Sequence, residues 1–288
     1  MEDFFFEIFV VFDYIKYMKK LIIIPDVHGR KFWIETVEKY RNNPEYHIVF
    51  LGDYLDPYVS YDHVSEEEAF EIFVQILDIA NNSDNITLLI GNHDLHYFPN
   101  FLSGWGCRRN EWRAKEISEL FIKNLKLFRV AYDVEIQGKQ YLFTHAGVTP
   151  EWWEKITGKQ LSENVQPWLD RSKFPEDVKM QLKSMTLDAK SLNQLIEIEQ
   201  GQYLLNSVGR SRGGYDQTGS CMWADFFDHV DEMYYDKKFY EDRYQIFSHT
   251  YSHPSTEEYC KNEYFAMLDC KKCFELDLET GELTQITE

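Results

Sequence analysis

Residues 48–56 read IVFLGDYLD, a run of four apolar residues that ends abruptly in a glycine and is followed by two acidic residues, Asp53 and Asp56. Such a run is typical of a buried β-strand. In open α/β sheets, ligands bind at the carboxyl ends of the strands. The stretch therefore predicts a central strand that delivers carboxylates to a ligand site.

Two other stretches end in the same way. Residues 21–29 read LIIIPDVHG, and residues 86–94 read ITLLIGNHD. An acidic or amide side chain after a single strand is commonly an ordinary turn. Three such ends in order, followed by further histidines, favour one shared site at the edge of a sheet. The side chains that we expect to meet there are Asp26, His28, Asp53, Asn92, His145 and His249.

These groups combine carboxylate oxygens, an amide oxygen and imidazole nitrogens, a set that suits Mn²⁺, Fe or Zn²⁺. All-cysteine zinc is excluded, and an all-oxygen calcium site is disfavoured. In hydrolytic two-metal sites the ions lie about 3.5–4 Å apart, and together they activate a water and neutralise phosphoryl oxygens. We interpret Asp53 as the carboxylate that bridges two such ions.

Length and composition limit the classes of protein to which the chain can belong. The 288 residues are enough for one large domain, or for one domain with an inserted subdomain. With 44% hydrophobic and 16% aromatic residues, the chain can bury a substantial core. The formal net charge of −19 argues against a membrane surface and against non-specific nucleic acid as partners, because both are anionic. The sequence does not indicate the oligomeric state.

Cysteine usage and the N-terminal residues bear on location. The five cysteines form no disulfide framework, and their odd number favours a reducing compartment, so we expect a cytoplasmic location. Cys270 and Cys273 have CxxC spacing without a second pair, and we interpret them as packed side chains rather than a zinc or redox site. Residues 1–17 are apolar but interrupted by acidic residues, which fits neither a signal peptide nor a membrane span. We interpret them as an extension of a domain that covers residues 18–288.

The order of the expected elements predicts an α/β fold. Strands alternate with helices in the first third of the chain, which implies a parallel sheet with right-handed crossovers. Ser65, followed by three glutamates, is a strong helix start. The expected strands are 20–25, 46–51 and 86–90, and the expected helices are 31–42, 65–80 and 111–126. Later elements are a hairpin at 128–136 and 140–144, a helical cap at about 150–240, and strands at 244–247, 264–268 and 273–278, the last two closing a second sheet.

Taken together, the strand-end motifs resemble those of the calcineurin-like metallophosphoesterases. The matching motifs are DVH at 26–28, GDYLD at 52–56, GNHD at 91–94, HAG at 145–147 and HT at 249–250. The resemblance covers about residues 20–278. It is greatest to the branch that holds serine/threonine-type protein phosphatases and symmetrical dinucleoside tetraphosphatases. It implies an α/β fold of four layers, α-β-β-α, in which two mixed sheets form a sandwich with a helical cap inserted.

The resemblance also implies roles for the matching residues. His93 would be the general acid that protonates the leaving alkoxide, with Asp56 holding its ring in an Asp–His dyad. Two divalent ions would be the cofactors, Mn²⁺ in the first instance in vitro, with Fe or Zn²⁺ as alternatives. The implied ligands are Asp26, His28 and Asp53 for the first ion, and Asp53, Asn92, His145 and His249 for the second.

Two departures from that branch concern the substrate. Pro57 and Tyr58 stand where the branch carries arginine and glycine, so one phosphate clamp is missing. Tyr251 stands where nucleases and phosphodiesterases of the superfamily carry a second histidine, which argues against those activities. Arginine matches phosphate geometry better than other side chains. The candidate clamps are therefore Arg212, Arg210 and Arg109.

We expect a hydrolase that cleaves phosphomonoesters by attack of a metal-bridging hydroxide, most simply a phosphatase of the protein-phosphatase type. Its substrate would be a phosphorylated protein or a nucleotide. One alternative is a dinucleoside polyphosphate hydrolase, whose groove for the bases would come from Trp152, Trp153 and Trp168 unless these side chains simply pack. The other alternative is a metal-binding scaffold without activity, which the complete set of ligands and the intact acid dyad disfavour.

Overall fold

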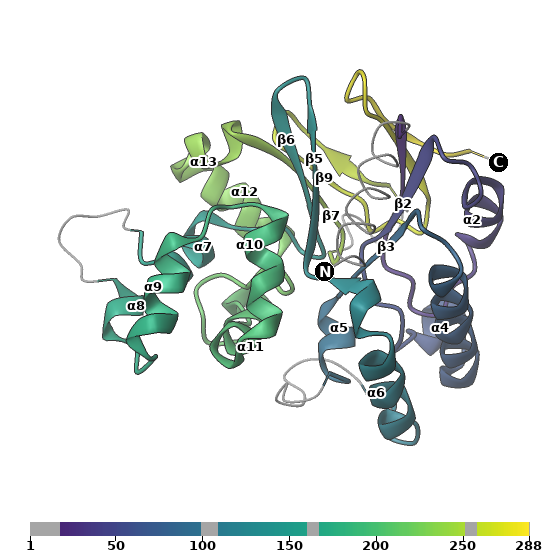
Figure 1. The fold of residues 1–288 in the computed structure, drawn as a ribbon, viewed down its shortest axis with the longest axis horizontal. Coiled ribbons are helices and arrows are strands. Elements are labelled where there is room, and N and C mark those ends of the chain that lie inside the picture. Colours follow the sequence, from purple (N-terminus) through teal and green to yellow (C-terminus); the bar gives the residue numbers. More distant parts are fainter. Residues whose placement is uncertain (1–17, 99–108, 160–166, 251–257, 288) are drawn as a thin grey trace, which may run out of the picture.

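Two β-sheets lie face to face between two layers of helices (Figure 1). The computed structural model describes residues 18–98, 109–159, 167–250 and 258–287. The expected N-terminal extension, residues 1–17, lies outside the described residues. In Figure 1, helices α2, α4 and α6 lie on one side of the strands, and α7 to α13 lie on the other. The predicted four-layer α-β-β-α sandwich is confirmed.

The first sheet has six strands in the order β11-β10-β1-β2-β3-β4. Neighbours from β1 to β4 run parallel, whereas β10 and β11 join antiparallel at one edge, so the sheet is mixed. The parallel part follows the predicted order of strands and crossover helices. The strands are β1 (Lys20–Ile24), β2 (Tyr46–Phe50), β3 (Ile86–Leu89), β4 (Phe128–Arg129), β10 (Phe274–Asp277) and β11 (Leu283–Gln285).

The second sheet has five strands in the order β5-β6-β7-β9-β8. Its central strands β6, β7 and β9 run parallel, and β5 and β8 pair antiparallel at the edges. The carboxyl ends of β6 and β7 therefore point the same way. The strands are β5 (Ala131–Ile136), β6 (Lys139–Thr144), β7 (Arg243–Phe247), β8 (Cys260–Lys261) and β9 (Phe265–Met267).

The helices that cover the first sheet include the one predicted from its cap. The Ser65 hydroxyl accepts a hydrogen bond from the Glu68 N–H, and the Glu68 carboxylate accepts one from the Ser65 N–H at 2.9 Å, which is a capping box. The helices before the hairpin are α2 (Ile34–Tyr40), α3 (Val59–Asp62), α4 (Glu66–Asn81), α5 (Asn92–Leu95) and α6 (Ala114–Lys123). Those after it are α7 (Pro150–Thr157), α8 (Trp168–Arg171), α9 (Glu176–Ser184), α10 (Ala189–Gln194), α11 (Glu199–Leu205), α12 (Phe226–Tyr235) and α13 (Lys237–Glu241).

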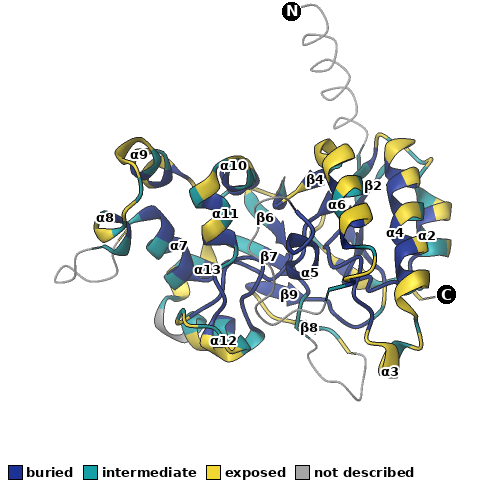
Figure 2. Ribbon diagram, turned by 90° about the horizontal axis from the view of Figure 1, so that it is seen from below, coloured by how far each residue is buried: buried dark blue, intermediate teal, exposed yellow. Residues whose placement is uncertain are grey.

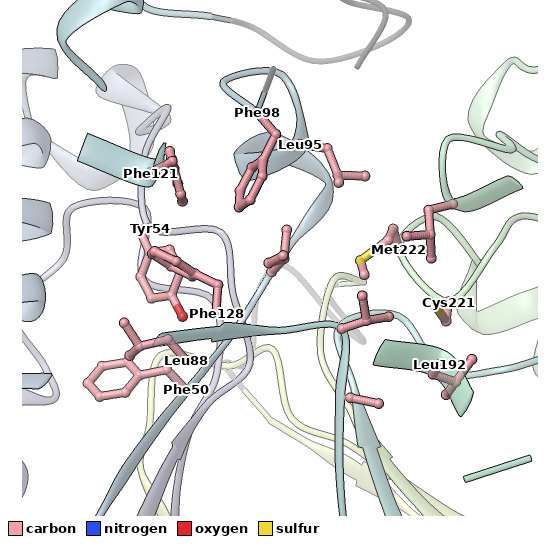
Figure 3. Packing of buried hydrophobic residues seen from close by; sticks show 14 of the residues in the cluster. Phe50, Tyr54, Leu88, Leu95, Phe98, Phe121, Phe128, Leu192, Cys221 and Met222 are labelled. Carbon is pink, nitrogen blue, oxygen red and sulfur yellow. The ribbon is translucent and has the colours of Figure 1, made fainter. Parts of the chain in front are cut away.

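The alternation of side chains between the two faces of β1 explains why residues 21–24 are all apolar. Leu21 and Ile23 are fully buried between the two sheets, whereas Ile22 and Ile24 are fully buried against the helices. A strand covered on both faces needs apolar residues at every position. Figure 3 shows the helix side of this core, where Phe50, Tyr54 and Phe128 lie near Phe121. In Figure 2 the outward faces of α2 and α4 are exposed.

One predicted strand was wrong in its continuity, and another was wrong in its sheet assignment. The expected strand 128–136 divides at Val130: β4 joins the first sheet and β5 begins the second. The side-chain oxygen of Asn193 accepts hydrogen bonds from the N–H groups of Val130 (2.7 Å) and Ala131 (3.0 Å), which satisfies the backbone where the chain crosses between sheets. The expected strand 273–278 pairs with β1 in the first sheet, because the chain turns at Lys271, whose φ is 58°.

Within the described ranges, no helix combines the length and the apolar character that crossing a membrane requires.

Candidate metal centre

Five strand ends bring the expected ligands to one place. Asp26 follows β1, Asp53 follows β2, and Asn92 follows β3; from the second sheet, His145 follows β6 and His249 follows β7. The site therefore lies where the carboxyl ends of the parallel strands of both sheets meet. The ligand side chains are buried or nearly so, so each polar atom needs a partner.

Two glycines allow the ends of β2 and β3 to approach closely. A Cβ atom on Gly91 would lie 2.1 Å from Asp53 Oδ1, and one on Gly52 would lie 2.5 Å from the Gly91 nitrogen. Any other residue at either position would displace Asp53. The glycines of the GD and GN motifs are thus required by the contact between the two strand ends.

Four non-glycine residues of the site have left-handed backbone conformations. The φ angles are 44° at His28, 53° at Asp53, 58° at Asp56 and 68° at His249. Such conformations cost of order 1–3 kcal/mol each and persist only where the surroundings enforce them. Asp94 supplies part of that enforcement, because its Oδ2 accepts hydrogen bonds from the N–H groups of Asp53 and Gly91, both at 2.8 Å.

Hydrogen bonds to carbonyl groups set the orientation of two imidazoles. The Nδ1 atom of His28 lies 2.8 Å from the Leu55 carbonyl oxygen, and Nδ1 of His145 lies 2.8 Å from that of Leu51. A carbonyl oxygen can only accept, so Nδ1 carries the proton in both rings. The Nε2 atoms of both histidines are thereby directed into the site, as in metal-binding histidines held by an outer hydrogen bond.

Asp53 lies between these two imidazoles. Its Oδ2 is 3.5 Å from His28 Nε2 and 3.4 Å from His145 Nε2. His145 Nε2 also lies 2.8 Å from Asn92 Oδ1 and 3.1 Å from His249 Nδ1. Lone pairs from a carboxylate, an amide and imidazoles thus converge on one small space. This donor set fits a divalent transition metal.

The described residues contain two overlapping groups whose ligand atoms lie within 4.8 Å of one another. The second group, Asp53 with His145 and His249, consists of three of the residues expected to bind the second ion. The first group has His93 with His28 and Asp53, where the prediction has Asp26. Asp26 Oδ2 is nevertheless 3.8 Å from His28 Nε2, and Ser248 donates a hydrogen bond to Oδ1 of Asp26, so this carboxylate is fixed beside the same histidine. Asp53 belongs to both groups.

His93 is held by contacts that differ from those of the expected ligands. Its backbone N–H donates to Asp53 Oδ1 at 2.9 Å, and its Nδ1 lies 3.1 Å from Asp56 Oδ2. A carboxylate accepts, so Nδ1 donates to it and Nε2 is on the side of the ring away from Asp56. The structure therefore brings together the two residues expected to form an acid dyad, next to Asp53.

Electrostatics in the site are dominated by burial and by the contacts between acidic groups and imidazoles. Burial opposes ionisation of Asp53, yet the imidazoles of His145 and His93 hold its pKa well below the usual range. Burial also opposes protonation of His145, but Asp53 and Asp26 raise its pKa to about 9. Burial lowers the pKa of His28 to about 3, so that ring is neutral near pH 7. A proton on His145 thus carries positive charge that an ion could supply instead.

The carboxyl end of β9 adds an acidic residue that the sequence analysis did not single out. Asp269 is 8% exposed, and its Oδ1 is buried without a hydrogen-bond partner among the described residues. The strand-end signal was present there, but no glycine or histidine accompanied it. Nε2 of His249 is likewise buried without a partner in the described part of the chain. Unpartnered buried lone pairs beside acidic groups are consistent with a site for cations.

The three candidate arginines lie in different surroundings. Nη2 of Arg212 donates to the Thr250 hydroxyl at 2.6 Å, directly beside His249, and its Nε lies 2.7 Å from Asp225. The Arg109 guanidinium lies over the ring of Tyr97, 5.6 Å from its centroid. Arg210 is exposed. Arg212 therefore borders the metal-ligand cluster. Arg109 instead contacts Tyr97, whose hydroxyl donates a hydrogen bond to Asp56 of the dyad.

The tryptophans of the helical segment pack in the interior. Trp152 and Trp153 are 1% and 4% exposed, and the Trp152 indole donates to the Leu204 carbonyl. Trp168 is half-buried, with Lys155 over its ring. Trp152 and Trp153 are therefore too deeply buried to line the groove for bases that a dinucleoside polyphosphate hydrolase would need. A different tryptophan approaches the site: the Trp223 ring lies 6.0 Å from that of His249.

Comparison with solved structures finds likenesses at low sequence identity. A serine/threonine phosphatase from Saccharomyces cerevisiae, described as similar to human phosphatase PP5, is 14% identical, with a TM-score of 0.43 over 94% of this chain and 81% of that chain. A protein assigned as a diadenosine tetraphosphatase is 12% identical, with a TM-score of 0.41 over 93% of both chains. An archaeal phosphodiesterase is 13% identical, with a TM-score of 0.36 over 93% of this chain and 98% of that chain.

Comparison with curated protein sequences gives no match. The sequence profile of the calcineurin-like phosphoesterases, in contrast, matches residues 19–251, which is most of the chain and includes all five strand-end motifs. Members of this family are hydrolases that depend on two metal ions. The chain belongs to the calcineurin-like phosphoesterase family.

Proposed function

We propose that the protein is a phosphatase of the protein-phosphatase type, which hydrolyses phosphomonoesters at a two-metal site. The observation that carries this proposal is the position of Asp53, whose carboxylate lies 3.5 Å and 3.4 Å from the Nε2 atoms of two imidazoles that are both oriented toward it. A carboxylate between two imidazoles is suited to serve two ions at once. The phosphorylated substrate would bind at this carboxyl edge of the sheets.

The proposed ligands divide around Asp53. Two divalent ions, Mn²⁺, Fe or Zn²⁺, would supply an activated water and positive charge for the phosphoryl oxygens. We assign Asp26 and Asp53 to the first ion because both carboxylates lie within 3.8 Å of His28 Nε2. The proposed ligands are Asp26, His28 and Asp53 for the first ion, and Asp53, Asn92, His145 and His249 for the second.

His93 is proposed as the general acid. When water attacks phosphorus and the P–O bond to the leaving group breaks, the leaving oxygen needs a proton. The Nε2 atom of His93 can provide it, because Nδ1 is occupied by Asp56 and a ring nitrogen of His93 lies within 4.8 Å of Asp53. The Asp56 carboxylate fixes the tautomer and stabilises the protonated ring before transfer.

Arg212 is the proposed phosphate clamp, and Arg109 is the second candidate. Pro57 occupies the position where the related branch carries arginine, so no guanidinium is available there, and the ring of the next residue, Tyr58, lies 5.2 Å from that of His28. Arg212 approaches from the opposite side, next to His249. It comes from the segment at about 150–240, which we propose as the cap of the site.

The proposed function is tested by the substrates that the metal-loaded protein cleaves. With Mn²⁺ present, we expect hydrolysis of p-nitrophenyl phosphate and of a phosphoserine peptide, loss of both activities on chelation, and slower cleavage of a dinucleoside tetraphosphate. His93→Ala should reduce hydrolysis of the peptide by about 10²–10⁴-fold and that of p-nitrophenyl phosphate far less, because p-nitrophenolate leaves without a proton. Metal content should be unchanged.

Cleavage of the dinucleoside tetraphosphate alone would assign the protein to the alternative function. Equal loss on both monoesters in His93→Ala, or loss of metal from that variant, would mean that His93 is a ligand or a structural residue. Steady-state kinetics and metal analysis of the same preparations distinguish these results.

The arginine assignment predicts unequal effects of three alanine substitutions. Arg212→Ala should raise KM and lower kcat/KM by about tenfold or more, corresponding to roughly 1.4 kcal/mol of lost transition-state stabilisation. Arg210→Ala should have the smallest effect, because Arg210 is exposed. If Arg212→Ala is silent and Arg109→Ala is severely impaired, the phosphate is held on the side of the dyad instead.

Metal binding is expected to release a proton from His145. The pKa of this buried imidazole is about 9 in the absence of metal, and only the neutral ring can bind an ion. Affinity for Mn²⁺ should therefore increase with pH up to about 9, with release of about one proton at pH 7. Calorimetric titrations in two buffers of different ionisation enthalpy count that proton. Binding without proton release at pH 7 would remove His145 from the ligand set.

A further inference from the structure

Tyr97 is buried behind the acid dyad and is bonded to it. The phenol is 1% exposed, and its hydroxyl donates to Asp56 Oδ1 at 2.6 Å. The other oxygen of the same carboxylate, Oδ2, lies 3.1 Å from His93 Nδ1. Asp56 is thus held from two sides, by the histidine that it orients and by a tyrosine that follows helix α5, the helix that carries this histidine.

The Tyr97 hydroxyl is itself fixed by a backbone group. The N–H of Asn110 donates to the phenol oxygen at 2.7 Å, which directs the hydroxyl proton toward Asp56. A rotation of the hydroxyl away from the carboxylate would break the bond to Asp56 and direct the hydrogen toward the incoming Asn110 N–H. The result is a continuous series of hydrogen bonds from the Asn110 N–H through Tyr97 and Asp56 to the ring of His93.

Asp56 needs this support because its own conformation is strained. Its φ is 58°, in the left-handed region that aspartate adopts only under constraint, and the residue is buried. Replacing the phenol by a phenyl ring would remove the donor to Oδ1 in a site closed to water. Asp56 would then lose a hydrogen bond that helps to define the direction of its carboxylate, and through it the direction of the His93 ring.

We propose that Tyr97 is a positioning residue for the general acid: through Asp56 it holds the His93 ring with Nε2 directed to the leaving oxygen. The proposal rests on the proposed function of His93. Tyr97 itself neither donates the transferred proton nor contacts the substrate. The proton passes from His93 Nε2 to the leaving oxygen as the P–O bond breaks, and the hydrogen bonds of Asp56 to His93 and Tyr97 persist throughout.

Arg109, the second candidate for the phosphate clamp, also contacts Tyr97. Its guanidinium lies over the ring of Tyr97, 5.6 Å from the centroid. Arg109 is the neighbour of Asn110, whose N–H fixes the phenol. Residues 109 and 110 thus contact Tyr97 through an arginine side chain and through the backbone, so displacement of these two residues would alter the orientation of the acid.

The test is the ratio of two activities measured on one preparation of Tyr97→Phe loaded with Mn²⁺. The ratio of phosphoserine-peptide to p-nitrophenyl phosphate turnover should fall about tenfold, a part of the roughly 10²–10⁴-fold that a general acid contributes. The loss should be in kcat, with KM and metal content unchanged. Because both activities come from the same sample, a smaller folded fraction cancels from the ratio.

Tyr54→Phe is the matched control. The Tyr54 side chain is fully buried, and its hydroxyl donates to the Leu89 carbonyl at 2.7 Å, outside the dyad. It should lower thermal stability by an amount similar to Tyr97→Phe but leave the ratio of the two activities unchanged. A second control is Tyr97→Phe combined with Asp56→Asn, which should lower the ratio no further than Asp56→Asn alone.

The outcomes separate this inference from the function on which it rests. If His93→Ala changes the ratio and Tyr97→Phe does not, the acid assignment holds and the role of Tyr97 is refuted. If neither variant changes the ratio, the acid assignment itself fails. If Tyr97→Phe and Tyr54→Phe lower the ratio equally, the effect is not specific to the bond between Tyr97 and Asp56, and the inference is wrong.

Discussion

The carboxylate of Asp53 is the group on which the site depends. It is held in a left-handed backbone conformation by the contact between the ends of β2 and β3, which only glycine at positions 52 and 91 permits. Asp94 fixes the same turn by accepting hydrogen bonds from the backbone N–H groups of Asp53 and Gly91. With this carboxylate in place, the imidazoles of His28 and His145 lie on either side of it. The sandwich fold serves to bring five strand ends to this one point.

The charges of the site explain why it is suited to cations. Asp26, Asp53 and Asp269 are all buried, and burial together with the charges of Asp26 and Asp53 raises the pKa of Asp269, in a protein whose net charge is −19. Burying carboxylates is costly unless a counter-charge accompanies them. Without metal, part of that charge is supplied by a proton on His145, whose pKa is raised to about 9 by Asp53 and Asp26 although burial opposes protonation. Bound ions would take over this role and add the Lewis acidity that phosphoester hydrolysis requires.

The sequence predicted strands β1, β2 and β3 of the first sheet, with the candidate ligands at their ends, because these features depend on local signals. Apolar runs that end in Asp, Asn or His specify a strand and its last residues at once, and Ser65 with Glu68 specifies the start of α4. The sheet assignment of residues 128–136 could not be read in this way, because it depends on Asn193, which lies more than 60 residues away along the chain. Tyr97 was missed for the same reason: its link to Asp56 spans 41 residues and leaves no pattern in the sequence. The choice among the arginines likewise depended on how the loops pack.

The most direct test of the account is the position of the ions themselves. Crystals of the protein grown with Mn²⁺ and measured near the manganese absorption edge should show two anomalous peaks about 3.5–4 Å apart, both within bonding distance of the Asp53 carboxylate. One should also be bound by Asp26 and His28, and the other by Asn92, His145 and His249. A single ion, or two ions that do not share Asp53, would contradict the central claim.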